Sequence, residues 1–259
     1  MCHIERREVT FGNGTGRIDE YMNTSPWTSD RITRRWLADQ EERERKRAPQ
    51  WRLMGELLPF DESDSFVFLD LGAGTGAAAR ALLDLYPQSS AILADLSPQI
   101  MDEGVRAMEP YNGRFHYVEF DMLAEHWSPA IPASLDAVIT SQCIHHLPDE
   151  RKQSVFAEIL GRLAPGSWYI NFDPVTSGDP TVAAAWQRAN DRQDPKSITK
   201  RTNRTPEEQE NYENHVRYMV PLVRQVDYLR LAGFEAVDVY WKHLDYVIYG
   251  GRRPLTDCR

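Results

Sequence analysis

The sequence predicts an α/β fold in which helices cover both faces of a doubly wound, largely parallel sheet. Short apolar segments alternate with helix-like segments between residues 65 and 172. The first of them, Phe66–Leu71, shows no polar alternation, as expected for a strand buried on both faces. It runs into the glycine-rich turn Gly72–Gly76, and a helical pattern follows. Strands that alternate with helices in this way form a parallel sheet with right-handed crossovers.

A helical region precedes the sheet. Residues 1–24 are polar and glycine-rich and indicate a loose arm. Over Ser29–Leu58 the apolar residues recur at helical spacing. We expect Pro49 to divide this stretch into two helices and Pro59 to end the second, because proline lacks the N–H that a helix interior needs.

Six further strands are predicted after the first. Ser97 and Pro98 begin the helix after the second strand, as N-cap and first helical residue. Helices are also expected over Asp149–Leu163 and over Leu222–Ala232, the latter capped by Gly233. The predicted strands are Ser90–Ala94, Phe115–Phe120, Leu135–Thr140, Trp168–Phe172, Ala236–Trp241 and Asp245–Tyr249.

Residues 174–220 interrupt the alternation of strands and helices. They are polar and charged, and their pattern is helical. A structureless loop of this length is improbable inside a compact domain. We therefore expect a helical insertion that serves as a lid or as a homodimer contact.

Composition excludes several classes of protein. The chain has 259 residues, 41% hydrophobic and 27% charged, with a net charge of −9, which opposes nucleic-acid binding. No apolar run is long enough to span a membrane and no signal region begins the chain, so a cytoplasmic location is expected. Cys2, Cys143 and Cys258 are too scattered for a disulfide framework or a zinc cluster, and no metal site is predicted. Positive charge is concentrated in three segments, which either form solvated helix faces or meet a small anionic substrate: Arg31–Arg35, Arg43–Arg47 and Arg188–Arg204.

The glycine-rich turn is the sharpest local signal for a ligand site. Glycine lets the backbone turn tightly and approach a ligand, and the next helix presents free N–H groups. Asp95, Asp121 and Ser141 follow neighbouring strands, at the edge where open α/β sheets bind ligands. Taken alone, Gly72–Ala77 with Asp95 also satisfies the fingerprint of a dinucleotide site.

Asp70 makes the pattern more specific, because it stands two residues before the first glycine in the run Leu69–Gly76. This run resembles the first motif of the class I S-adenosylmethionine-dependent methyltransferases. The family's later motifs are matched in order by Asp95–Pro98, Asp121-Met122, Ile139–Leu147, Leu163–Gly166 and Leu231–Phe234. The resemblance implies a seven-stranded, Rossmann-like sheet. It also implies a cofactor-binding methyltransferase domain over 61–259, preceded by an N-terminal arm and helices over 1–60 on the substrate side.

The resemblance implies that the strand ends bind S-adenosyl-L-methionine (SAM), which leaves as S-adenosyl-L-homocysteine. Asp70 would contact the methionine amino group. Asp95 would accept hydrogen bonds from the ribose hydroxyls, and Asp121 would take the adenine amino group. The predicted cofactor-binding residues are Asp70, Gly72, Ala73, Gly74, Gly76, Asp95, Leu96, Asp121, Met122, Thr140 and Ser141.

Methyl transfer requires an aligned acceptor, exclusion of water and, for some acceptors, removal of a proton. The candidate catalytic residues are His145 and His146, just after the fourth strand, and Asp173, after the fifth. In the family the corresponding histidine pair is often structural. The predicted substrate-binding residues are Tyr21, Trp27, Trp51, Arg52 and Arg188, of which the aromatic ones could instead pack in the core.

The insertion carries a second resemblance. The segment Trp186–Asn190 is similar to the corresponding region of carboxy-SAM synthases, in which an arginine, here Arg188, holds the extra carboxylate of a modified cofactor. The loop Gly72–Gly76 and the pair His145-His146 depart from that family, so ordinary SAM is the expected cofactor.

The leading hypothesis is a SAM-dependent methyltransferase that acts on a small-molecule acceptor. No nucleic acid or membrane partner is expected, and a homodimer through the insertion is possible. The alternatives are a non-catalytic or regulatory SAM-binding protein, an enzyme that uses carboxy-SAM, and a nicotinamide oxidoreductase. The last is disfavoured because no Tyr-x-x-x-Lys motif or comparable hydride-transfer site follows the fourth strand.

Overall fold

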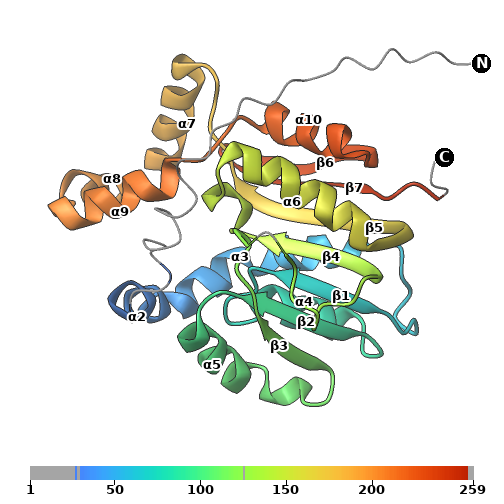
Figure 1. The fold of residues 1–259 in the computed structure, drawn as a ribbon. Helices are drawn as coiled ribbons and strands as arrows, with labels where there is room; N and C mark the ends of the chain where they lie inside the picture. The colour runs from blue at the N-terminus through green and yellow to red at the C-terminus, as the bar shows by residue number, and fades with distance from the viewer. Residues whose placement is uncertain (1–26, 28–29, 125, 256–259) are drawn as a thin grey trace, which may run out of the picture.

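The computed structural model describes residues 27, 30–124 and 126–255, which form a seven-stranded sheet (Figure 1). The strand order is β3-β2-β1-β4-β5-β7-β6. The first five strands of this order pair in parallel, and β7 runs antiparallel to both β5 and β6. The strands are β1 (Val67–Leu71), β2 (Ser90–Asp95), β3 (Phe115–Glu119), β4 (Leu135–Ser141), β5 (Leu163–Pro174), β6 (Glu235–His243) and β7 (Tyr246–Arg252). The predicted doubly wound sheet is confirmed. Successive strands are added on one side of β1 up to β3 and then on its other side from β4 onward, so the strand order reverses between β1 and β4.

Helices cover both faces of the sheet. One hydrophobic core lies between the sheet and α6 and α10, and the other lies between the sheet and α3 and α4. None of the described helices is both long and apolar enough to cross a membrane. The helices of the described residues are α2 (Asp30–Ala38), α3 (Gln40–Glu56), α4 (Ala77–Leu85), α5 (Pro98–Ala107), α6 (Asp149–Arg162), α7 (Pro180–Gln193), α8 (Lys196–Thr202), α9 (Pro206–Val216) and α10 (Leu222–Ala232), with short 3-10 turns η2 (Glu109–Tyr111) and η3 (Ile144–His146).

Strand β1 shows why the apolar runs lack alternation. Phe68 belongs to the core beneath α3 and α4, whereas Leu69 and Leu71 belong to the core beneath α6 and α10. Successive side chains of a strand point to opposite faces, so a strand covered on both sides needs apolar residues at successive positions. The polar exception is Asp70, which is fully buried.

The prediction that Pro49 divides the N-terminal helices is wrong. The helical stretch is interrupted at Asp39, between α2 and α3, and Pro49 lies inside α3. A proline inside a helix costs about 3 kcal/mol. Burial of Trp51 and Met54, on the following turn of α3, offsets this cost, because each large apolar side chain contributes about 1.5–3 kcal/mol.

The predicted helical insertion is confirmed by α7, α8 and α9, which project from the sheet on the same side as α2 (left in Figure 1). Their starts are capped by side chains. Asp179 accepts a hydrogen bond from the backbone N–H of Thr181, and Thr205 forms a capping box with Glu208. These local signals define helix starts, but they do not specify where the insertion packs.

Candidate active site

A cavity of about 1080 Å³ opens where β1, β2 and β4 end. Its walls come from the turns after these strands and from residues of α2, α3, α8 and α9. Open α/β sheets bind ligands at this edge, where the strand order changes direction. Most of the predicted cofactor-binding residues line the cavity: Asp70, Gly72, Ala73, Gly74, Asp95, Leu96, Asp121, Met122 and Ser141.

The glycine-rich turn has a backbone that other residues could not adopt without strain. Gly72 and Gly74 have φ angles of +76° and +56°. A Cβ atom on Gly72 would lie 2.1 Å from Sγ of Cys143, which also lines the cavity. Glycine is therefore required at position 72 both for the backbone angle and for the close approach of the turn after β4.

Asp70 lies fully buried beneath this turn. Neither of its carboxylate oxygens has a hydrogen-bond partner among the described residues. Burial raises the pKa of Asp70 to about 7; the nearby backbone N–H of Ala79 opposes the rise, and the charge of Asp95 adds to it. A buried carboxylate without a partner is costly, and a cationic ligand group in the cavity would remove that cost.

Asp95 holds the turn and faces the cavity. Its carboxylate accepts hydrogen bonds from the backbone N–H of Gly74 at 2.7 Å and of Ser97 at 3.0 Å. Burial raises the pKa of Asp95, and these backbone donors oppose the rise. Asp121, at the end of β3, accepts from the backbone N–H of Leu123 at 2.8 Å. The carboxylates that follow β2 and β3 are thus fixed by backbone groups and can still accept bonds from a ligand.

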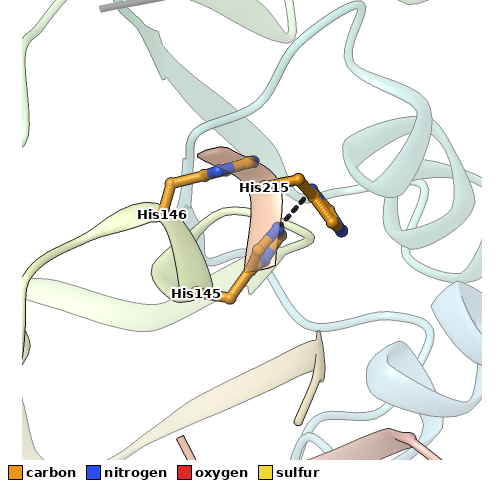
Figure 2. Close-up of side chains that lie close together, drawn as sticks. All are labelled: His145, His146 and His215. Atoms are coloured by element: carbon orange, nitrogen blue, oxygen red, sulfur yellow. Dashed lines mark hydrogen bonds between the residues drawn. The ribbon is translucent and has the colours of Figure 1, made fainter. Parts of the chain in front are cut away.

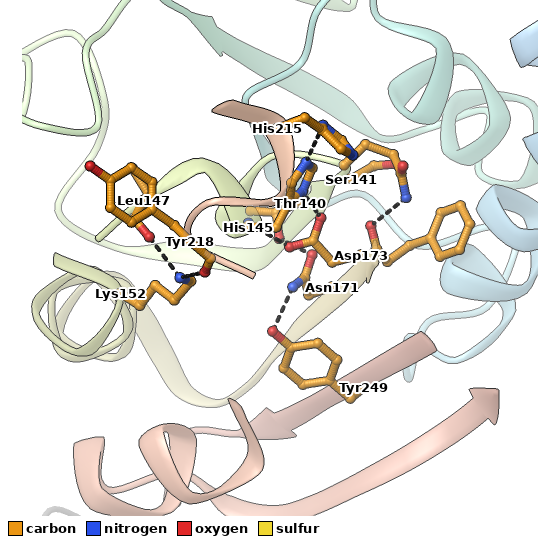
Figure 3. Close-up of polar contacts among 12 residues, drawn as sticks. Thr140, Ser141, His145, Leu147, Lys152, Asn171, Asp173, His215, Tyr218 and Tyr249 are labelled. Atoms are coloured by element: carbon orange, nitrogen blue, oxygen red, sulfur yellow. Dashed lines mark hydrogen bonds and ion pairs between the residues drawn. The ribbon is translucent and has the colours of Figure 1, made fainter. Parts of the chain in front are cut away.

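Two predicted cofactor residues do not line the cavity. Thr140 is fully buried and bonds to the Tyr169 hydroxyl at 2.8 Å. It also donates to Oδ1 of Asn171 at 2.7 Å (Figure 3). Gly76 is the left-handed N-cap of α4, packed against Leu93 and Met108. These residues support the cavity wall from behind.

The three predicted catalytic residues are close together, but only His146 lines the cavity. Asp173 and His145 are buried behind it. Asp173 accepts two bonds from His145, from the backbone N–H at 2.8 Å and from Nδ1 at 2.7 Å (Figure 3). Burial raises the pKa of Asp173 to about 7 and lowers the pKa values of His145 and His146 well below the usual range.

His215 of α9 completes this group, and sequence reasoning missed it. Its Nδ1 lies 3.3 Å from Nε2 of His145 (Figure 2). His215 also lines the cavity. Burial lowers the pKa of His215 as well. No local pattern connects positions 145 and 215, because only the packing of α9 against η3 brings them together.

The predicted substrate-binding residues fall into three groups. Tyr21 lies outside the described residues. Trp27 and Trp51 line the cavity. Trp27 makes an edge contact with His146, with ring centroids 5.5 Å apart, and Trp51 is buried and donates to Oγ of Ser141 at 2.7 Å. Arg52, exposed on α3 and 2.8 Å from Glu56, and Arg188, on α7, do not line the cavity.

Other arginines line the cavity instead, and the sequence analysis did not assign them. Arg43 and Arg47 of α3, with Arg204 and Arg217 around α9, belong to the cavity wall. The guanidinium of Arg43 stacks 4.4 Å from the ring of Trp36. Arg43, Arg47 and Arg204 lie in segments that were singled out by their positive charge, but the sequence could not show that they face a common space.

Comparisons with known proteins agree with this architecture. A family model described as a methyltransferase domain matches residues 68–166. The trans-aconitate 2-methyltransferase of Pseudomonas paraeruginosa is 27% identical over 208 residues, which cover 72% of this chain and 66% of that protein. The acetylserotonin O-methyltransferase of Gallus gallus is 28% identical over 131 residues, which cover 50% of this chain and 36% of that protein. The chain thus spans less than two thirds of the length of either relative.

Solved structures share the fold. An O-methyltransferase family protein from Burkholderia thailandensis has a TM-score of 0.63 at 20% identity. The match covers 92% of this chain and 67% of that protein's chain. Human N-acetylserotonin methyltransferase in complex with SAM has a TM-score of 0.60 at 14% identity. The match covers 93% of this chain and 64% of that protein's chain. The predicted fold class is confirmed by these similarities.

Proposed function

We propose, from its membership of the class I SAM-dependent methyltransferases, that this chain transfers a methyl group from SAM to a small anionic acceptor. The single observation that carries the proposal is that one cavity contains both parts of such a site. Strand-end carboxylates line one part of it, and arginine, tryptophan and histidine side chains of η3 and the helices line the rest.

The residues of the first part fit SAM. The unpaired carboxylate of Asp70 would face the cationic amino acid portion of the cofactor, and Asp95 would accept from the ribose hydroxyls. Asp121 and Met122 would lie at the adenine, and the turn Gly72–Gly76 would let the backbone approach the ligand closely. When bound, SAM supplies a methyl group on a positively charged sulfur for in-line displacement.

The residues that line the rest of the cavity favour an anionic acceptor. Two of the acidic residues in the wall are already paired, since Glu44 lies 2.7 Å from Arg80 and Glu208 pairs with Arg35. Arg204 and Arg217 stack on tyrosine rings instead, and among the described residues neither has an acidic partner within salt-bridge distance. Guanidinium groups bind carboxylates with directional, charge-assisted hydrogen bonds. The relative that acts on trans-aconitate, a carboxylate compound, is consistent with this acceptor class.

The chain's own groups would then divide the work as follows. Arginines of α3 and the α9 region bind and orient the acceptor, while α2, α3 and α9 exclude water from it. His146, held neutral by burial, contacts the acceptor. His145 and Asp173 act as positioning residues behind it. The division of the chain at residue 60 stays part of this proposal, because α2 and α3 supply much of the acceptor side.

The proposal can be tested with labelled SAM and a panel of small carboxylic acids, phenols and amines. We expect methyl transfer to an acidic member of the panel. The Arg217→Ala variant should raise KM for that acceptor and leave the affinity for S-adenosylhomocysteine unchanged. Arg188→Ala, which removes an arginine outside the cavity, is the matched control and should change neither. Failure to bind S-adenosylhomocysteine, or a preference for amines, would contradict the proposal.

A further inference from the structure

We propose that His145, His146 and His215 form a binding site for one divalent transition-metal ion, with Zn²⁺ as the probe, at the acceptor side of the cavity. One imidazole nitrogen from each residue lies within 4.8 Å of the other two (Figure 2). Histidine nitrogen is a preferred ligand for zinc, copper, iron and nickel. We predicted no metal site from the sequence because the cysteines are scattered, whereas this site needs a histidine from a distant helix.

The separation of two of these nitrogens suits a bound ion. Nε2 of His145 and Nδ1 of His215 are 3.3 Å apart. Two nitrogens at about 2.0–2.1 Å from an ion at tetrahedral angles lie about 3.3 Å from each other. The third nitrogen, that of His146, needs to approach the other two by up to about 1.5 Å to reach the same distances. The imidazole of His146 lines the cavity, where it contacts the rings of Trp27 and His145.

Asp173 provides the hydrogen-bond partner that a metal-binding histidine usually has on its other ring nitrogen. It lies 2.7 Å from Nδ1 of His145 and so favours the form in which Nδ1 carries the proton and Nε2 is a free ligand atom. Histidines that bind metals usually donate their other N–H to a carboxylate or carbonyl, which fixes the ring and raises its basicity.

Lys152 holds the two segments that carry the histidines. It is buried, and its Nζ donates to the carbonyl oxygen of Leu147 at 2.6 Å and to that of Tyr218 (Figure 3). Leu147 follows His146 directly, and Tyr218 lies three residues after His215. Lys152 therefore holds the backbone near His146 next to the backbone near His215 before any ion binds, which lowers the ordering cost of binding.

The site would be open on the side where the acceptor is expected. His146 and His215 line the cavity, while His145 lies behind them. Three protein ligands with an open fourth position are typical of catalytic rather than structural zinc sites. An ion there would bind an oxygen of the acceptor and lower its pKa. This role rests on the proposed methyl transfer, whereas binding of the ion does not.

The experiment is calorimetric titration of the chelator-treated full chain with Zn²⁺. Co²⁺ is added in parallel, because its visible spectrum reports a tetrahedral nitrogen site. We expect one equivalent to bind, and His215→Ala to weaken binding by at least about tenfold. Asp173→Asn should weaken it without changing the stoichiometry. His116→Ala, which removes an exposed histidine of β3, is the matched control and should have no effect.

Two outcomes would overturn the metal site: no stoichiometric binding, or binding that His215→Ala and His146→Ala leave unchanged, which would mean an adventitious ion only. S-adenosylhomocysteine binding is measured on each variant to show that the fold is intact. A chain that binds this ligand but no metal refutes the metal site alone. A chain that binds the ion yet transfers no methyl group to any acceptor refutes the proposed function and leaves the metal site standing.

Discussion

Nζ of Lys152 donates a hydrogen bond to the carbonyl oxygen of Leu147 at 2.6 Å, and the lysine side chain is fully buried. The same nitrogen also donates to the carbonyl oxygen of Tyr218, two residues after the end of α9 (Figure 3). One buried ammonium thus joins the turn after β4 to the helical insertion. Both segments line the cavity, so this contact determines how its walls meet.

Replacing this lysine should loosen the insertion. In Lys152→Met the two carbonyls lose their donor, and an unsatisfied buried group costs about 1–3 kcal/mol. We expect a lower melting temperature and faster amide hydrogen exchange over 206–220, measured by mass spectrometry. Lys46→Met, which removes an exposed lysine paired with Glu42, should change stability by no more than about 0.5 kcal/mol. Equal effects of the two substitutions would show that Lys152 does not hold the insertion.

The Asp95 carboxylate should dominate ligand affinity. In Asp95→Ala the backbone N–H of Gly74 loses its acceptor and the ribose hydroxyls would lose a charged partner. We expect the Kd for S-adenosylhomocysteine to rise about 10- to 100-fold, since a hydrogen bond to a charged group contributes about 1.5–3 kcal/mol. Asp102→Ala, on the exposed side of α5, is the control for calorimetry. Unchanged affinity in a folded Asp95→Ala protein would remove Asp95 from the site.

Asp70 should make the stability of the ligand-free protein depend on pH. Burial raises its pKa to about 7, so between about pH 4 and pH 7 the folded chain binds more protons than the unfolded chain. This contribution to the free energy of unfolding is therefore present at low pH and is lost as the pH rises toward 7, by up to about 1.4 kcal/mol per pH unit. Thermal melts of the wild type and Asp70→Asn across this range isolate the contribution of Asp70.

The same carboxyl group should also couple ligand affinity to pH. A cationic ligand favours the ionised form of Asp70, so affinity for S-adenosylhomocysteine should rise with pH up to about 7 and then level off. Asp70→Asn should bind more weakly and show a flatter pH profile in the same titration. Parallel profiles for the two proteins would mean that Asp70 does not face the ligand's charge.

Gly72 should tolerate no side chain. In Gly72→Ala the new Cβ meets Sγ and Cβ of Cys143, and the φ angle of +76° is unfavourable for alanine. Gly113→Ala is a matched control, because its φ of +83° carries the same strain but nothing lies within 4 Å of the new atom. We expect the control to lose about 1 kcal/mol of stability, and Gly72→Ala to lose more and to bind S-adenosylhomocysteine poorly. Similar losses of stability in unfolding titrations, with binding intact, would contradict the assigned close contact.

Much of the cofactor half of the cavity could be read from the sequence, because its determinants are local. A glycine-rich turn directly after a buried strand prescribes its own backbone, and Asp95 follows the next strand, so parallel strand ends place both at one edge. The neighbours Thr140 and Ser141 show the limit of this reasoning. Alternation along β4 points the first into the core and the second into the cavity, and the pattern alone did not separate them.

The sequence by itself determined the order of strands and helices, the glycine-rich turn and the strand-end carboxylates, since each depends on residues close together in the chain. Tertiary packing alone decided the break at Asp39, the exclusion of Arg188 from the cavity and the meeting of His215 with His145. The physical reason is that these features arise from contacts between elements far apart in the chain. The stability of these contacts depends on how α3 and α9 pack against the sheet and its turns, and local sequence propensities do not predict that packing.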